Sequence, residues 1–414
     1  MTFFSFREGT LCAEKVPLTE IARQFGTPTY VYSRAAIERG YREFSEACSG
    51  HDVLICYSVK ASSNLAILNL LARLGSGFDI VSGGELARVL AAGGSADKTV
   101  FSGVGKSESE LRAGLEAGVF CFNVESEEEL ERLASIAAGM GRTAPVSLRV
   151  NPDVDPKTHP YIATGLRESK FGIAYDAALP LYRKAAKLRG IRIAGIDVHI
   201  GSQITDVEPF VAALDKVLEF VDALDASGVR LEHLDLGGGL GIRYRDESPP
   251  ELQTYLGRLF QRLGKRKIRL LFEPGRSLVG NTGLLLTRVE YLKHGAAKNF
   301  AVVDAAMNDL VRPALYDAWH DVLPVTRRHG AALRYDVVGP VCESADFLAK
   351  ERTLTVAAGD LLAIMSAGAY GMSMSSNYNS RPRPAEVIVN AETATLVRER
   401  EQTATLFASE RLLP

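Results

Sequence analysis

The sequence predicts an α/β protein: a (β/α)8 TIM barrel followed by a mostly antiparallel β domain. Two observations predict this fold. Between residues 52 and 273, eight short apolar runs alternate with amphipathic helical stretches. Near-continuous apolar strands that alternate with helices are typical of a parallel sheet covered on both faces. After Gly280, strand-like runs follow one another without long helices between them, which favours an antiparallel arrangement.

Each of the eight runs ends at a polar or glycine residue. The expected barrel strands are 52–58, 77–81, 99–102, 120–124, 145–150, 193–199, 231–236 and 268–272. Helical patterns lie between them over 63–74 and over 126–139, where Ser126 and Glu129 have the spacing of a capping box. Eight repeats in about 220 residues match the size of a (β/α)8 barrel, and a doubly wound open sheet is the alternative.

The strand-like runs outside the barrel indicate how the chain is divided. In the second half they are 284–292, 299–304, 334–338, 353–356, 361–364 and 385–390. Another run, Thr29 to Tyr32, precedes a helical stretch over 34–47. We therefore expect an N-terminal segment over 1–33 that joins the β domain, a barrel over 34–280, and the β domain over 281–414.

Composition excludes several classes of protein. Of the 414 residues 46% are hydrophobic, and the net charge is −2, so the chain is not disordered as a whole and has no basic stripe for nucleic acid. No apolar run approaches the ~18 residues of a membrane span, and the apolar start is too short for a signal peptide. Five cysteines without a CxxC pair fit a reducing compartment. We expect a cytoplasmic enzyme with no membrane partner.

Polar residues gather where the predicted strands end, and in a TIM barrel this end carries the active site. The residues just after the strands are Lys60, Ser82, Gly103, Asn123, Asn151, His199, Gly237 and Glu273. Ordinary turns explain the serine, the asparagines and the glycines. They explain less well a lysine, a histidine and a glutamate at the same end of one barrel.

Three of these positions suggest a common chemistry. Desolvation at an apolar strand end favours the neutral amine of Lys60, which can form a Schiff base. The triplet Gly237 to Gly239 follows the seventh strand, where barrel loops often bind phosphate, and Glu273 follows the eighth. Taken singly, they also fit a solvated lysine, a tight turn and an ion pair. Together they indicate pyridoxal 5'-phosphate, an electron sink whose ring nitrogen takes a carboxylate partner.

Other motifs carry no such indication. Gly105-Lys106-Ser107 resembles the end of a P-loop, but Val100 stands where that motif needs a glycine. The seven histidines are scattered and no HExxH occurs, so we expect no metal site.

Beyond these positions, the whole chain resembles the diaminopimelate decarboxylases, which are pyridoxal-phosphate enzymes with an alanine-racemase-like barrel. The resemblance lies in the joint order of many short motifs, each weak alone. They are Tyr57 to Ala61, Phe78 to Leu86, Thr158 to Tyr161, Ser169 to Gly172, His199 to Gln203, Gly237 to Gly239, Glu273 to Arg276, Asn308 to Tyr316, Gly339 to Ser344 and Ala369 to Gly371. One departure is Ser62-Ser63, where the family more often has an asparagine.

The resemblance implies a role for each matching residue. The catalytic residues would be Lys60 as the Schiff-base lysine, His199 stacked on the cofactor ring, Glu273 at the ring nitrogen and Cys342 as proton donor. The phosphate and cofactor would also be held by Ser202, Gly237, Gly238, Gly239, Gly275, Arg276 and Tyr370. The substrate would be bound by Arg276, Arg312, Tyr316, Glu343 and Tyr370.

The implied reaction converts meso-2,6-diaminopimelate to L-lysine and CO2, the last step of lysine biosynthesis. The implied assembly is a homodimer in which Cys342 and Glu343 complete the partner subunit's site. Four alternatives stay open on the residues alone. They are a decarboxylase for ornithine, arginine or a carboxylated polyamine, a racemase that uses Tyr370, a cofactor-binding protein without turnover, and a Schiff-base aldolase. Among these, Arg276, Arg312 and Tyr316 favour a dicarboxylic substrate, since a guanidinium binds carboxylate bidentately.

Overall fold

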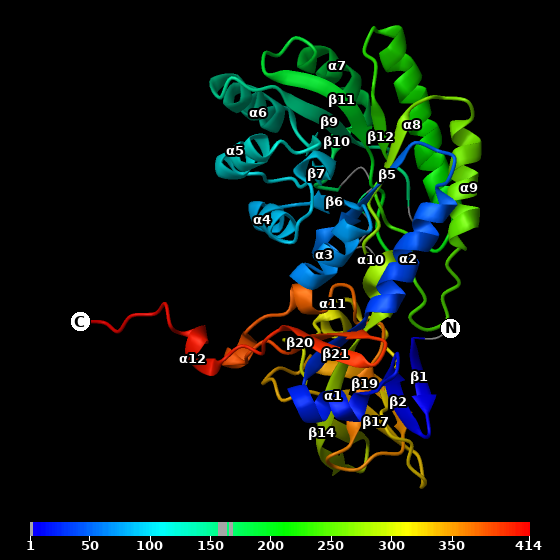
Figure 1. The fold of residues 1–414 in the computed structure, drawn as a ribbon, viewed down its shortest axis with the longest axis vertical. Helices are drawn as coiled ribbons and strands as arrows, with labels where there is room; N and C mark the ends of the chain where they lie inside the picture. The colour runs from blue at the N-terminus through cyan, green and yellow to red at the C-terminus, as the bar shows by residue number, and fades with distance from the viewer. Residues whose placement is uncertain (1–2, 156–163, 165–168) are drawn as a thin grey trace. The chain divides into compact units, whose positions relative to one another are not determined.

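The computed structural model describes residues 3–155, 164 and 169–414. They form two compact units (Figure 1). The barrel unit consists of 41–242 and 248–277, and the β unit consists of 1–40, 243–247 and 278–414. The predicted motif at Thr158 to Tyr161 lies outside the described residues.

The barrel unit contains a closed parallel sheet with the strand order β5-β6-β7-β8-β9-β11-β12-β13-β5. The strands are β5 (Val53–Ser58), β6 (Gly77–Ile80), β7 (Thr99–Phe101), β8 (Cys121–Val124), β9 (Ala144–Asn151), β11 (Ile191–Asp197), β12 (His233–Asp235) and β13 (Arg269–Phe272). A two-residue strand, β10 (Ile173–Ala174), adds to β9. The predicted eight-stranded barrel is therefore confirmed, and the open sheet is excluded.

Helices follow the barrel strands in the βα order that the sequence predicts (Figure 1). They are α3 (Leu65–Arg73), α4 (Gly83–Ala91), α5 (Glu108–Ala117), α6 (Glu127–Gly139), α7 (Tyr175–Ala185), α8 (Glu208–Ala226), α9 (Leu252–Leu263) and the short α10 (Arg276–Val279). The helix α2 (Arg34–Ala47) precedes the first barrel strand. Ser and Asn caps set several helix starts, as at Asn64 before α3, whose side chain accepts from the N–H of Ala66.

The start of α6 corrects one detail of the prediction. Ser126 does cap the helix by accepting from the N–H of Glu129. The Glu129 carboxylate does not return to Ser126, however, but accepts from the Glu125 N–H and the Lys106 ammonium. The Lys106 side chain is fully buried, and a buried ammonium needs a carboxylate more than a helix start needs a second cap. Lys106, which stands in the segment that resembles a P-loop, therefore connects the loop after β7 to the start of α6.

The β unit is a mostly antiparallel sheet with the strand order β18-β17-β15-β14-β4-β20-β21, to which β19 and β16 add beside β14. The strands are β4 (Thr29–Ser33), β14 (Gly283–His294), β15 (Asn299–Val303), β16 (Val322–Pro324), β17 (Leu333–Val338), β18 (Phe347–Leu354), β19 (Leu361–Ile364), β20 (Ala385–Asn390) and β21 (Thr393–Arg398). The N-terminal strand β4 pairs with both β14 and β20. The predicted β domain is thus confirmed.

Some strands of this unit differ from the prediction. The run 353–356 is only the end of β18, whose central residues include Lys350, Glu351 and Arg352 and so do not look like a strand. Both β16 and β21 were missed, since one has three residues and the other lies largely exposed at the sheet edge. A three-stranded sheet of β1 (Phe4–Arg7), β2 (Thr10–Ala13) and β3 (Val16–Pro17) was missed too, because its strands have only 4, 4 and 2 residues.

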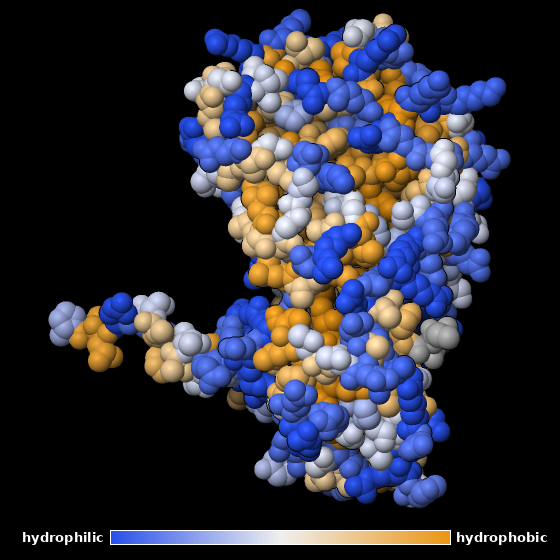
Figure 2. Space-filling view, viewed as in Figure 1, coloured by the Kyte–Doolittle hydropathy of each residue, from blue (hydrophilic) through white to orange (hydrophobic). Residues whose placement is uncertain are grey.

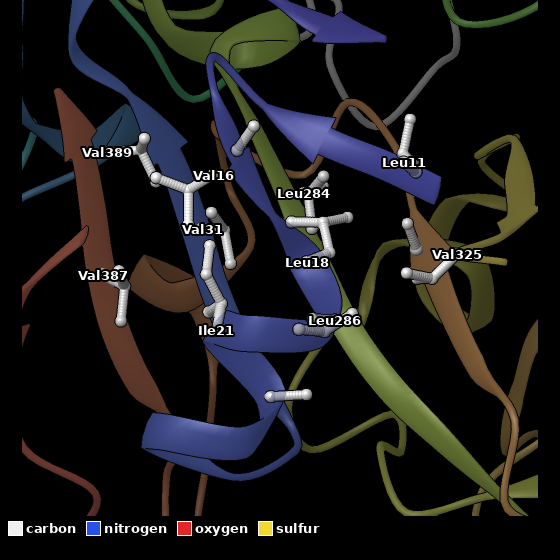
Figure 3. Packing of buried hydrophobic residues seen from close by; sticks show 13 residues of the cluster. Leu11, Val16, Leu18, Ile21, Val31, Leu284, Leu286, Val325, Val387 and Val389 are labelled. Carbon is white, nitrogen blue, oxygen red and sulfur yellow. The ribbon is translucent and has the colours of Figure 1, made fainter. Parts of the chain in front are cut away.

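The β unit has its own apolar core (Figure 3). Leu18 and Ile21 of α1 (Leu18–Phe25) pack there with Val31 of β4 and Leu284 of β14. Strand β20 contributes Val387 and Val389 to the same cluster. Residues from both ends of the chain are therefore needed to bury one core.

Two further features concern the surface. Among the described residues, no helix is both long and apolar enough to cross a membrane. After α12 (Thr403–Leu406) the chain ends in an exposed tail that carries apolar surface (Figures 1 and 2). Leu412 and Leu413 are 98% and 94% exposed.

Candidate active site

Lys60 lies directly after β5, in a single 3-10 turn that spans Val59–Ala61. Its Nζ is 2.9 Å from Oδ2 of Asp79, which is fully buried on β6. The Ser58 hydroxyl donates to the same oxygen at 2.7 Å and is 3.1 Å from the backbone carbonyl of Glu273. The amine therefore faces a fixed carboxylate, and Ser58 connects that carboxylate to the end of the eighth strand.

The glycine triplet after β12 is packed against its neighbours so closely that side chains are excluded. A Cβ on Gly238 would lie 2.2 Å from the Glu273 carbonyl oxygen, and a Cβ on Gly239 would lie 2.4 Å from that of Gly201. The N–H of Gly237 donates to Asp235 at 3.0 Å, and the N–H of Gly238 donates to Nδ1 of His199 at 3.2 Å. The loop is thus held in shape by its own N–H groups.

The hydrogen bond from Gly238 also defines the state of His199. Because Nδ1 accepts from a backbone N–H, it carries no hydrogen, and the ring is neutral. Burial lowers the pKa of His199 well below its usual value, and the nearby Arg149 and Lys60 lower it further. A neutral ring held at its edge by the loop can stack flat against an aromatic cofactor.

Glu273 is 5% exposed, and its Oε1 has no hydrogen-bond partner among the described residues. One carboxylate oxygen each from Glu273, Asp197 and Asp235 lie within 4.8 Å of one another. Burial raises the pKa of Glu273 well above its usual value, and the charges of Asp235 and Asp79 raise it further. Burial also raises the pKa of Asp235 to about 6. A buried carboxylate oxygen without a partner is suited to accept a hydrogen bond from a ligand.

The strand register explains this cluster. In the parallel sheet Arg149 of β9 is paired with Asp197 of β11, and Asp197 is paired with Asp235 of β12. Arg149 lies 3.8 Å from Asp197 and 3.2 Å from Glu125. Glu125 accepts as well from the N–H groups of Gly103 and Gly172. A chain of buried charges therefore links Glu273 to the loops after three other strands.

Two more predicted residues meet beside the eighth strand. Arg276 is buried at the start of α10, and its Nη2 is 3.0 Å from the hydroxyl of Ser202. Gly275 precedes it, and a Cβ there would lie 3.0 Å from Ser58 and from Ala61. The structure thus brings together the predicted barrel residues Lys60, His199, Ser202, Gly237, Gly238, Gly239, Glu273, Gly275 and Arg276.

The other predicted site residues belong to the β unit. Arg312 is buried, and Tyr316 half-buried, on the short helix α11 (Arg312–Tyr316). Cys342 and Glu343 lie exposed in the loop after β17, where the Cys342 N–H donates to Oδ1 of Asn379 at 2.8 Å. Tyr370 follows β19 in a left-handed conformation, with φ of 55°. Their roles stay predictions.

Sequence reasoning missed the buried carboxylates Asp79, Asp197 and Asp235, and the supporting pair Arg149 and Glu125. A signal for them existed. Each aspartate stands in a run predicted as a barrel strand, Asp79 in 77–81, Asp197 in 193–199 and Asp235 in 231–236, and charged residues are seldom fully buried without a functional or structural partner.

Comparison with known proteins agrees with this geometry. The family of pyridoxal-dependent decarboxylases, described by its pyridoxal-binding domain, matches residues 34–280. Diaminopimelate decarboxylase of Pseudomonas aeruginosa is 60% identical over 414 residues, which is 100% of both chains. The chain belongs to the family of pyridoxal-dependent decarboxylases. The diaminopimelate decarboxylase of Vibrio cholerae is 56% identical over 416 residues and 100% of both chains.

Solved structures give the same relationship. A diaminopimelate decarboxylase from Helicobacter pylori, complexed with L-lysine, has a TM-score of 0.92 and 41% identity. The match covers 95% of this decarboxylase and 99% of that chain. A lysine/ornithine decarboxylase from Vibrio vulnificus, at 23% identity, shares the fold with a TM-score of 0.80.

The barrel residues fit pyridoxal 5'-phosphate, the cofactor of the family. Glu273 presents a buried carboxylate oxygen that has no partner within residues 3–155, 164 and 169–414, and such an oxygen suits a ring nitrogen that carries a proton. Lys60 presents an amine on the same side of the barrel, and the glycine triplet leaves no room for side chains next to His199. The identification of this decarboxylase as a pyridoxal-phosphate enzyme, predicted from the sequence, is confirmed.

Proposed function

We propose that this decarboxylase removes one carboxylate of meso-2,6-diaminopimelate and releases L-lysine and CO2. The observation that supports the proposal most is that one end of the barrel carries both Lys60, held by Asp79, and a buried Glu273 whose Oε1 has no hydrogen-bond partner among the described residues. The substrate is supported by the full-length relatives, which are named for it. Two buried arginines, Arg276 and Arg312, suit a substrate with two carboxylates.

Bound pyridoxal 5'-phosphate supplies an electron sink for the electrons that the departing CO2 leaves behind. The protein residues keep that sink effective. Glu273 would keep a proton at the ring nitrogen, and one oxygen each of Asp235 and Asp197 lies within 4.8 Å of a Glu273 oxygen. Lys60 would hold the cofactor through its amine, and Asp79 keeps that amine in place. His199 would contact the cofactor ring.

Two residues of the β unit would bind the far end of the substrate. Arg312 and Tyr316 lie at opposite ends of one short helix and would hold the carboxylate that stays on the product. Arg276 and Ser202 lie within hydrogen-bond distance of each other in the barrel unit, and they would hold the phosphate and a substrate oxygen. Tyr370 would contact both the cofactor and the substrate.

We also propose that the active enzyme is a homodimer with shared sites. Cys342 and Glu343 lie exposed on a loop that a hydrogen bond from the Cys342 N–H to Asn379 helps to fix. Their exposure would be explained if both side chains enter the active site of the partner subunit. There the Cys342 thiol would return a proton to the α carbon, and Glu343 would bind the distal ammonium. The exposed leucines of the C-terminal tail also favour a partner surface. All five cysteines are free thiols, which is consistent with location in the reducing cytoplasm.

Incubation of the purified enzyme with meso-diaminopimelate tests the proposal. We expect stoichiometric CO2 and L-lysine, and no turnover of ornithine or arginine at equal concentrations. The Lys60→Ala variant should lose both products and the visible absorbance of the bound cofactor. Epimerised diaminopimelate without CO2 would instead establish a racemase.

A further inference from the structure

His320 is a completely buried residue of the β unit for which the proposed mechanism has no role. It lies shortly after α11, in the segment that leads to β16. Its Nε2 is 2.9 Å from Nη1 of Arg312, and its Nδ1 is 2.8 Å from the backbone carbonyl of Met365. The ring therefore bridges the main chain after β19 and the guanidinium proposed to bind substrate.

The chemistry of the two partners permits one protonation state. A guanidinium has only donors, so Nε2 must accept from Arg312 and carries no hydrogen. A carbonyl oxygen only accepts, so Nδ1 must carry the hydrogen that it donates to Met365. His320 is therefore a neutral imidazole of fixed tautomer, since an imidazolium could not accept from Arg312.

This bond fixes the direction of the guanidinium. The guanidinium carbon of Arg312 lies 4.6 Å from the centre of the Tyr244 ring. The His320 ring meets the same tyrosine edge-on, at 5.4 Å and 78°. An arginine side chain has large rotational freedom, and a guanidinium must present its flat edge to bind carboxylate bidentately. A histidine on one nitrogen and a tyrosine beneath the plane restrict both its position and its tilt.

The segment that carries His320 is itself anchored. The His320 carbonyl accepts from Nη2 of Arg352 at 3.1 Å. The guanidinium of Arg352 lies 3.2 Å from the centre of the Trp319 ring, and the indole N–H of Trp319 donates to Asp321 at 2.8 Å. The histidine is thus held from its backbone as well as from its ring, so it can act as a fixed support.

We propose that His320 is a positioning residue that orients Arg312 for the carboxylate retained in the product, and so sets the preference for dicarboxylic substrates. This inference rests on the proposed role of Arg312. It concerns binding of the far end of the substrate and does not concern bond breaking. Removal of His320 should therefore raise KM far more than it lowers kcat.

Two product-like ligands separate this role from a general structural one. L-Lysine keeps the carboxylate that Arg312 would bind, whereas cadaverine has the same carbon chain and amines but no carboxylate. In the holoenzyme, His320→Leu should raise KM for meso-diaminopimelate and the inhibition constant of L-lysine by about tenfold or more, because a hydrogen bond to a charged group is lost. Inhibition by cadaverine should stay within about twofold.

Three variants complete the experiment. His320→Gln keeps an acceptor for Arg312 and should recover part of the lysine affinity. If the leucine variant does not fold, the glutamine variant replaces it in the measurement of lysine and cadaverine inhibition. His233→Gln is the matched control, since His233 is equally buried in the barrel unit and bonds to Ser147; it should leave both inhibition constants unchanged. Arg312→Gln tests the proposed role of the arginine itself.

The outcomes are distinct. If the Arg312 variant loses lysine affinity but folded His320 variants do not, the inference about His320 is wrong and the proposed function stands. Equal weakening of lysine and cadaverine by the His320 variants would also overturn the inference. If the Arg312 variant keeps its affinity for lysine, the proposed role of that arginine is wrong. The inference about His320 is then wrong as well, because it depends on that role.

Discussion

At the scale of single residues, Glu273 is a buried residue whose Oε1 has no hydrogen-bond partner in the described part of the chain. We expect Glu273→Gln to bind the cofactor with little loss, since the glycine loop and Lys60 are unchanged. Decarboxylation should fall about 100- to 1000-fold, because preorganised electrostatic groups contribute on that order to the rate. Single-turnover kinetics together with cofactor absorbance would measure the two effects separately.

A matched control is Glu232→Gln, which removes an exposed carboxylate of the same barrel that pairs with Arg192. It should leave kcat unchanged. If Glu273→Gln also retains its kcat, another group must keep the ring nitrogen protonated, and the assignment of Glu273 is wrong.

The neighbouring Asp235 predicts a pH effect on stability. Burial raises its pKa to about 6, so the folded protein binds a proton that the unfolded chain has released above pH ~4. Stability from this group is therefore present at low pH and is lost as pH rises through about 6. Asp235→Asn removes the titration, so its melting temperature should rise relative to wild type as the pH increases from about 4 to about 6 and should keep that difference at higher pH. Calorimetric scans of the cofactor-free enzyme would test this.

The comparison variant is Asp52→Asn at an exposed ion pair with Arg269. Its difference from wild type should stay nearly constant over the same pH range. Parallel pH profiles for Asp235→Asn and wild type would contradict the raised pKa.

At the scale of elements, the loop after β12 is packed so closely that its glycines leave no space for a side chain. A Cβ on Gly238 would stand 2.2 Å from the carbonyl oxygen of Glu273, which is backbone and cannot move cheaply. Gly238→Ala should therefore destabilise the barrel by about 1–3 kcal/mol and weaken cofactor binding. Thermal unfolding and a cofactor titration would measure both.

Gly257→Ala offers the opposite case within the same unit. Gly257 lies inside α9, and an added Cβ there would meet nothing within 4 Å. This variant should be more stable by about 0.4–1 kcal/mol. If Gly238→Ala is as well tolerated as Gly257→Ala, the close approach to Glu273 does not constrain the loop.

Some residues at this end of the barrel could be predicted from the sequence, and others could not. Lys60, His199 and Glu273 were predictable because each follows an apolar run, and the ends of parallel strands meet at one end of a barrel. Asp197 and Asp235 were not, because each is the last residue of a strand that also contains another polar residue, Arg192 in β11 and His233 in β12. They become neighbours only through the register that pairs β11 with β12. His320 was missed for a similar reason, since its two partners are 8 and 45 positions away.

At the scale of the whole molecule, the proposal assigns roles to residues of each unit and to residues of a second subunit. Lys60 and Glu273 belong to the barrel unit, whereas Cys342 belongs to the β unit. If Cys342 completes the partner's site, two inactive variants can complement each other. A heterodimer of Lys60→Ala and Cys342→Ala subunits would have one site with both defects and one with neither.

We therefore expect the mixed variants to recover activity towards about half of wild type per heterodimer. The measurement is lysine formation after subunit exchange, with exchange verified by differently tagged chains. Lys60→Ala mixed with Glu273→Gln is the control, because both residues lie in the barrel unit of one chain. Each site of that heterodimer keeps one defect, so activity should stay low. If the Lys60 and Cys342 variants exchange subunits without recovery, Cys342 acts within its own chain or not at all, and the shared site is wrong.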